Sequence, residues 1–219
     1  MPHVITYTEE IEEYGYCQQR PELRTGDKYL LEVEGKQRLR IVLSVHLDKY
    51  VWENVAQWTT TIMEFFEEEY TLTTVLMNFG QLNQSEIPVF VANGMMGVLS
   101  CDKDLVKGNL IVPSKRFNVP VKGVAPFGFY DCQHLTKVIF DVGVVIAYEY
   151  AFAKSGIKEM AFNDLVPVMV HATAIDGCEN LPKFDKIFDK PFPGKYMIRG
   201  GDAFHEWEEK LYELHFLNR

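Results

Sequence analysis

The sequence has little cysteine, and no two cysteines have the spacing of a metal or redox site. The four cysteines lie at positions 17, 101, 132 and 178, so none forms a C-x-x-C pair. That spacing gives no support to a zinc ribbon or a thioredoxin-like site. The opening residues, MPHVITYTEE, lack the basic and apolar segments of a secretory signal. We therefore expect reduced thiols, a cytoplasmic protein, and no bound metal or cofactor.

Positive charge is also scarce. The chain has 31 acidic residues against 22 lysines and arginines, a formal charge of −9. Nucleic-acid binding needs a concentrated basic surface, so this balance argues against that class of partner. The densest basic cluster, within 183–195, is interleaved with Asp185 and Asp189, which is typical of a solvated face.

A long apolar run is missing as well. The longest candidate, 138–153, is interrupted by Asp141 and Glu149, so we expect no membrane-spanning segment and a soluble protein. We also find no internal repeat and no low-complexity stretch. The expected organisation is one globular domain over 1–219, with 1–27 as a peripheral arm and 178–201 as an irregular segment.

What the chain does contain is enough apolar and aromatic material for a packed core. Hydrophobic residues make up 47% and aromatic residues 13% of the 219 residues. Aromatic side chains each bury a large area, so this content indicates either a bulky core or rings that line an interface or pocket. Composition leaves both alternatives open.

Several segments have the pattern of strands. Leu39, Ile41, Leu43 and Val45 alternate with polar residues, so 28–34 and 37–45 are predicted to form a hairpin that turns at Gly35. A second hairpin joins 87–92 to 95–100 through Asn93-Gly94, a pair suited to a tight turn. Further strands are expected at the following ranges: 71–79, 110–113, 119–124 and 165–175.

Three other segments have apolar residues at helical spacing. Residues 51, 55, 58, 62 and 65 recur at steps of three and four, which predicts a helix after Asp48. A second helix is expected over 131–155, where two strands around Gly143 are the alternative. A third begins at Asp202, with a stripe at 204, 207, 211 and 214. The predicted fold class is α+β: a mainly antiparallel β-sheet packed against two or three amphipathic helices.

An acidic run, 67–69, falls at the expected end of the first helix, where the helix dipole disfavours negative charge. Such a run is either a fraying helix end or a surface kept acidic for a partner. The fraying end is the simpler interpretation, because isolated charge runs are usually solvated.

The best local candidate for chemistry is His171-Ala-Thr173. A strand with His-x-Thr points both side chains to one face. An imidazole acting as acid or base, beside a hydroxyl that holds a phosphate oxygen, resembles one half of a two-histidine phosphoesterase site over about five residues. The second half would be His134-Leu-Thr136, which falls in the predicted helix, where residues two apart do not share a face. The simpler interpretation is a core histidine with satisfied hydrogen bonds.

The same stretch, H-A-T-A-I-D-G, is similar to the His-x-x-x-Asp-Gly signature of chloramphenicol-acetyltransferase-like and dihydrolipoyl acyltransferases. In that family the histidine deprotonates the acyl acceptor, so the resemblance implies roles for His171, Asp176 and Gly177. Here four residues separate the histidine from the aspartate, one more than in the signature. Alignment on Asp176-Gly177 therefore places Ala172 where the base should be.

Two further residues are of interest. Glu149, in an apolar stretch, is either a buried carboxylate or a side chain that faces water. Cys132, at the expected start of a helix, is where a thiolate would be favoured. Because no complete catalytic set is visible, the favoured hypothesis is a non-enzymatic binding or assembly protein that has a protein partner or self-associates. The alternatives are a phosphoesterase-type hydrolase using His171 and Thr173, and an acyltransferase using the 171–177 region.

Overall fold

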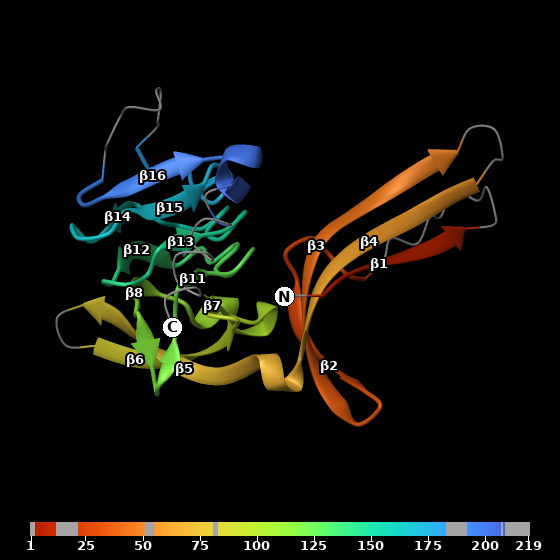
Figure 1. Ribbon diagram of the computed structural model, residues 1–219, viewed down its shortest axis with the longest axis horizontal. Helices are drawn as coiled ribbons and strands as arrows, with labels where there is room; N and C mark the ends of the chain where they lie inside the picture. Colours follow the sequence, from red (N-terminus) through yellow and green to blue (C-terminus); the bar gives the residue numbers. More distant parts are fainter. Residues whose placement is uncertain are drawn as a thin grey trace.

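The computed structural model describes residues 3–11, 22–50, 55–80, 83–182, 192–206 and 208. Strand makes up 51% of the structure and helix 9%. The predicted α+β class, with two or three amphipathic helices over a sheet, is therefore wrong, and the protein is mostly β. Figure 1 shows two parts side by side: a stack of short strands and a curved sheet of long strands.

The long strands form a four-stranded antiparallel sheet in the order β1-β4-β3-β2. Its strands are β1 (His3–Ile11), β2 (Lys28–Val33), β3 (Lys36–Tyr50) and β4 (Val55–Phe66). The predicted hairpin at 28–45 is confirmed: Val33 pairs with Lys36 across a two-residue turn. Both turn residues, Glu34 and Gly35, have positive φ, as a tight hairpin turn requires.

The first predicted helix is instead part of this sheet. β4 pairs with β3 from Val55 to Phe66 and with β1 from Ala56 to Glu64, with Ile62 opposite both Ile5 and Val42. Residues three apart lie on opposite faces of a strand, and β4 is buried on both faces, with Ile62 1% and Phe65 0% exposed. Two-sided burial therefore produced a spacing that resembled a helical stripe.

The acidic run forms a short 3₁₀ turn, η1 (Glu67–Glu69), between β4 and β5 (Tyr70–Gly80). It does not end a helix, so the dipole argument does not apply. β5 pairs with β6 (Asn83–Ala92), and β6 pairs with β7 (Met95–Gly97). The strands predicted at 71–79 and 87–92 and the Asn93-Gly94 turn are confirmed.

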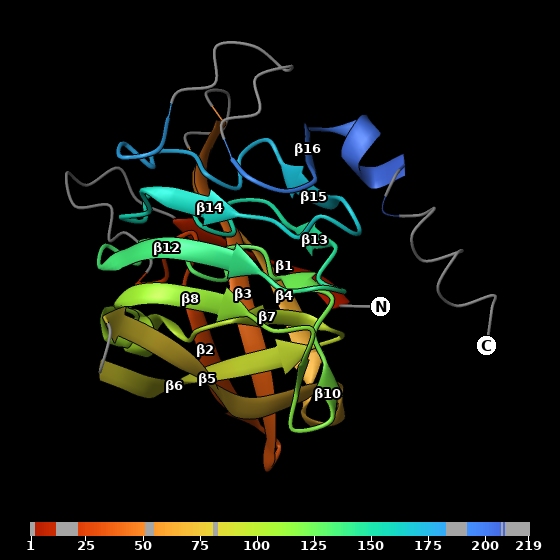
Figure 2. The ribbon, with the colours of Figure 1, turned by 90° about the vertical axis from the view of Figure 1, so that its left-hand side faces the viewer.

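From β7 onward the chain winds into stacked coils in which the strands are parallel (Figure 2). One ladder contains β7, β11, β13, β15 and β16, and another contains β8, β12 and β14. Their bounds, with those of the connecting 3₁₀ turn and hairpin, are η2 (Ser100–Leu105), β8 (Gly108–Val112), β9 (Lys115–Arg116), β10 (Val119–Pro120), β11 (Gly123–Val124), β12 (Leu135–Phe140), β13 (Ile146–Ala147), β14 (Glu159–Ala161), β15 (Val168–His171) and β16 (Tyr196–Arg199). Apart from β9 and β10, which pair with each other, each of these strands pairs with a segment one coil away, as in a β-solenoid.

The coils have a period that the sequence search missed. Gly123, Ile146 and Met169 occupy the same ladder position at intervals of 23 residues. The interval from Met95 to Gly123 is 28 residues and includes the β9–β10 hairpin. The expectation of no internal repeat is therefore wrong. A repeat of this length is one supersecondary unit that buries its apolar side against the neighbouring units.

The second predicted helix, 131–155, is also wrong, and it lies in these coils. β12 precedes Gly143 and β13 follows it, which is the alternative of two strands around this glycine. Gly143 itself has a φ of 96° and turns the chain between them. Some of the β-branched residues that made this stretch look like a buried helix face into the coil, such as Val138 and Val144, whereas Val142 is exposed.

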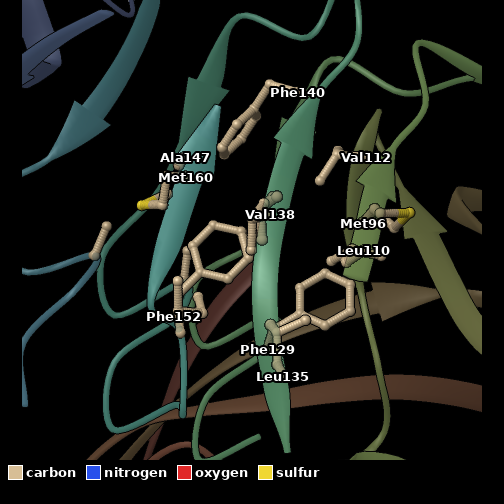
Figure 3. Close-up of a cluster of buried hydrophobic side chains, with 14 of the residues drawn as sticks. Met96, Leu110, Val112, Phe129, Leu135, Val138, Phe140, Ala147, Phe152 and Met160 are labelled. Carbon is tan, nitrogen blue, oxygen red and sulfur yellow. The ribbon is translucent and has the colours of Figure 1, made fainter. Parts of the chain in front are cut away.

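Apolar side chains from successive coils stack inside the solenoid (Figure 3). The rings of Phe129 and Phe152 are 5.7 Å apart and nearly parallel, and those of Phe140 and Phe162 are 4.9 Å apart. Backbone bonds between coils continue through the turns, as from Phe129 N to Ala151 O at 2.7 Å. The core is therefore a column of repeated positions.

A second apolar cluster joins the sheet to the coils. It contains Leu39 and Phe65 from the sheet, Phe127 and Tyr148 from the coils, and Phe204. Phe204 lies in a helical segment at 202–206 that begins where the third helix was predicted; residues 207 and 209–219 lie outside the described part, and so does most of the predicted stripe. No helix among the described residues is long and apolar enough to cross a membrane.

Candidate functional site

A large cavity lies where the four-stranded sheet meets the coils, and we call it the inter-sheet cavity. Its volume is about 1150 Å³. Leu43 of β3 and Met63 of β4 contribute one wall, and Tyr148 and Tyr150, which follow β13, contribute the facing wall. Because the walls come from segments that pair with different partners, the cavity exists only when both parts of the fold are assembled.

Most of the cavity lining is apolar or aromatic. The apolar and aromatic lining residues are Leu43, Met63, Val91, Met95, Val119, Pro120, Pro126, Phe127, Tyr148 and Tyr150. The rings of Phe127 and Tyr150 lie 5.0 Å apart and nearly parallel, so two neighbouring coils present one aromatic surface. A lining of this kind favours a ligand with apolar or ring-bearing groups.

The charged lining is mainly acidic. Glu68, Glu69, Glu149 and Glu208 line the cavity, against Lys122 and the exposed His205. Four carboxylates on a mostly apolar surface create a negative potential that attracts cationic groups. Two of the three residues of the acidic run at 67–69 therefore line the cavity.

The carboxylates occupy two levels of the stack. Glu69 O accepts the N–H of Asn93 at 3.3 Å, which places η1 beside the start of the first coil. Glu149 follows β13, which is separated from β7 by β11. Two strand spacings correspond to roughly 10 Å. The cavity therefore presents negative charge at both levels, with Phe127 between them.

His171 is the last residue of β15 and lies near Glu149, and Thr173 contacts its ring. Thr173 Oγ1 lies 2.8 Å from His171 Nδ1 and accepts the N–H of Tyr150 at 3.3 Å. The N–H of Thr173 also points to Nδ1, at 3.3 Å. These contacts are satisfied together when Nδ1 accepts and Nε2 carries the proton. His171 Nε2 then faces Glu149 Oε1 at 3.7 Å.

Glu149 is shared by two histidines. His205 Nε2 lies 3.9 Å from the same Oε1, and His205 Nδ1 lies 3.5 Å from Glu208 Oε2. Tyr148 Oη donates to Glu208 Oε1 at 2.7 Å. Burial lowers the pKa of His171, an effect that the Glu149 carboxylate opposes and His205 reinforces. These contacts bind His205 and Glu208 to the coils at the edge of the cavity.

The predicted site residues are only partly brought together. His171 and Thr173 are in contact, but Asp176 is exposed in the following turn, and its charge raises the pKa of His171 less than the Glu149 carboxylate does. His134 precedes β12 in the other parallel ladder, so the two His-x-Thr halves belong to different faces of the stack. The prediction of a helix over 131–155 is wrong, but the two halves are still apart, because they lie in different ladders of the coils.

Cys132 differs from its expected role. No helix starts there; the thiol is fully buried, and burial raises its pKa to about 12, so it is held as a thiol. Cys101, Cys132 and Cys178, the cysteines in the described part, are all free. Among the described residues, no group of three or more His, Cys, Asp and Glu side chains is placed to hold a metal ion.

Sequence reasoning missed the inter-sheet cavity because its residues come from segments far apart in the chain. The aromatic residues offered one clue, since the ring positions 127 and 150 are separated by one coil period. No protein-family model, no curated protein and no solved structure matches the chain.

Proposed function

We propose that this chain is a non-enzymatic binding protein that captures a basic, partly apolar segment of another protein in the inter-sheet cavity. The observation that carries the proposal is the lining: four carboxylates against Lys122 and His205 on aromatic and aliphatic walls. Such a surface binds lysine ammonium or arginine guanidinium groups beside apolar side chains through ion pairing, cation–π contacts and burial.

The size of the cavity favours a polypeptide segment over a small metabolite. Small-molecule sites typically measure about 300–1,000 Å³. The inter-sheet cavity, at about 1150 Å³, exceeds that range, and Tyr150 and Glu68 on its lining are exposed to solvent. An extended segment can enter such an opening and place charged groups at both acidic levels. Phosphate backbones would be repelled by the same carboxylates, so nucleic acid is not the proposed partner.

The proposed compartment is the cytoplasm. The support for it is chemical: Cys101, Cys132 and Cys178 are free, and Cys101 is exposed. Free exposed thiols persist where the surroundings are reducing. The proposed partner is accordingly a protein of the same compartment.

The test uses a short fluorescein-labelled peptide in which lysine alternates with phenylalanine, and a matched peptide with glutamate in place of lysine. Fluorescence anisotropy should show binding of the lysine peptide alone. Glu68→Lys should weaken that binding about tenfold, because it converts an attraction at the cavity wall into a repulsion. Glu67→Lys is the matched control, since Glu67 is exposed in the same turn but does not line the cavity. Equal binding of both peptides would contradict the proposal.

One observation favours a hydrolase as the second candidate: Thr173 and Glu149 hold the two ring nitrogens of His171 in a fixed orientation. A histidine can act as a general base only through an unprotonated nitrogen that faces the substrate, so Nδ1 would first have to leave Thr173 or Nε2 lose its proton. Against this, His171 is only 8% exposed and does not line the cavity. His171→Ala should abolish turnover of a phosphoester without lowering the melting temperature if the residue is catalytic. A lowered melting temperature would identify a core histidine.

A further inference from the structure

The tip of the β9–β10 hairpin has an unusual residue in its turn. Arg116 pairs with Val119, so Phe117 and Asn118 form a two-residue turn, with φ of 43° and 66°. Tight turns with positive φ at both positions favour asparagine, aspartate and glycine, because a Cβ is strained there. A phenylalanine at the first position is therefore a costly choice.

The other two tight turns in the described strands show what the chain uses elsewhere. Glu34–Gly35 and Asn93–Gly94 both place glycine at the second position, whereas Phe117–Asn118 has none. The side chain of Phe117 is also 70% exposed, so burial does not compensate for the strained backbone. Strain retained at an exposed apolar residue points to a contact made outside the monomer.

The β9–β10 hairpin holds the ring of Phe117 toward solvent. Arg116 Nε donates to Thr74 O at 2.8 Å, and its Nη2 lies 2.5 Å from Glu86 Oε1. The same guanidinium lies 4.3 Å from the centroid of the Phe117 ring. Arg116 thus fixes the hairpin alongside β5 and β6 (Figure 2), and leaves the exposed Lys115 and Phe117 as a basic, aromatic tip.

We propose that this tip inserts into the inter-sheet cavity of a second copy of the chain, with Phe117 against the aromatic wall and Lys115 near Glu68. The proposal rests on the proposed function and names its ligand: a basic segment with an apolar anchor. The charges are complementary, because the chain is acidic overall, at −9, while the tip presents the exposed Lys115 beside Phe117. An exposed ring on a positive hairpin is the kind of group that the cavity lining is suited to bind.

The position of the hairpin predicts a closed dimer. Val119 and Pro120 of β10 line the cavity, so the tip and the cavity of one copy are neighbours. When one tip enters the partner's cavity, the partner's tip lies beside the first cavity. A two-fold axis between them makes both contacts equivalent, which closes the assembly and prevents filament growth.

Sedimentation velocity tests the proposal. The full-length chain should form a dimer of twice its 25.3 kDa mass as concentration rises. Phe117→Gly should weaken dimerisation about tenfold or more, because it removes the anchor. Since glycine suits the positive φ, the melting temperature of this variant should not fall. Leu165→Ala is the matched control, because Leu165 is also 70% exposed.

A charge exchange then tests where the tip binds. Lys115→Glu and Glu68→Lys should each weaken self-association, and an equimolar mixture of the two variants should restore a heterodimer. A chain that stays monomeric, or a dimer unaffected by Phe117→Gly, would overturn the inference. If the chain stays monomeric but still binds the lysine–phenylalanine peptide, the proposed function stands and only the identity of the partner is wrong. If it does neither, both are wrong.

Discussion

The four-stranded sheet and the coils cover their strand edges in different ways. In the sheet, β2 pairs with β3 and β3 with β4, so most partners are neighbours in the sequence. In the coils, β11 pairs with β13 and β13 with β15, one period of 23 residues away. Local turn chemistry therefore specifies the sheet, whereas a repeated pattern of inward side chains specifies the coils.

The largest expected effect concerns the interior of the coils. Phe152→Ala should cost about 3–5 kcal/mol of unfolding free energy, because Phe152 is fully buried and stacks on Phe129. Urea denaturation measures the loss. Leu165→Ala, on the outside of the coils, is the control and should cost well under 1 kcal/mol. A small cost for Phe152→Ala would mean that this column of side chains does not stabilise the coils.

The next effect is at the junction of the two parts. Lys28 at the start of β2 is 2% exposed, and its ammonium donates to Phe127 O at 2.5 Å. Burial lowers the pKa of Lys28 from 10.5 to about 8. Between these two values the unfolded chain binds more protons than the folded one, so stability should rise with pH. The gain in unfolding free energy should reach about 3 kcal/mol when the pH has risen from about 8 to 10.5.

Lys28→Met should remove that dependence, which melting curves at stepped pH would measure. Lys107→Met, at a residue exposed to solvent, is the matched control. If the wild type shows no gain in stability above pH 8, the ammonium is solvated and the junction is looser than the structure indicates.

The smallest expected effect concerns the cluster of His171, Glu149 and His205 beside the cavity. Because the pKa of His171 is lowered by burial, the folded state resists a proton that the unfolded state accepts. Stability should therefore decrease as pH falls below about 6.5, where the unfolded histidine becomes protonated. Glu149, His205 and Asp176 also act on this group, so the profile reports the whole cluster.

His171→Gln should flatten this decrease, and exposed His134→Gln should not. Melting temperatures from pH 5 to 8 check the difference. A wild-type profile that rises on acidification would mean that the protonated histidine is stabilised by Glu149 more than it is penalised by burial.

The sequence predicted those parts of the fold that depend on local signals. The alternation at 37–45 and the Asn93-Gly94 pair specified hairpins, and both are present. It failed at β4, where burial on both faces placed apolar residues three and four apart, and at 131–155, where a coil has corners that mix inward and outward residues. A search for ring positions one coil period apart, such as Phe129 and Phe152, would have revealed the repeat.

The candidate site was predicted only in part. The spacing predicted His171 and Thr173 on one face of a strand; the structure does bring them into contact, but β15 ends at His171 and Thr173 lies in the turn that follows. The cavity does not follow from any local pattern, since Met63, Phe127 and Glu208 meet only after the sheet packs on the coils. The acidic run at 67–69 is visible in the sequence, but that it lines a cavity follows only from the folded structure.

The central claim is that the sheet and the coils together form one binding cavity. Hydrogen exchange of the full chain, with and without the lysine–phenylalanine peptide, tests it most directly. We expect slower exchange on both walls, in β4 around Met63 and in the segment around Tyr148–Tyr150, and an unchanged rate on the outer strand β14. Protection confined to one wall, or spread evenly over the molecule, would contradict the claim.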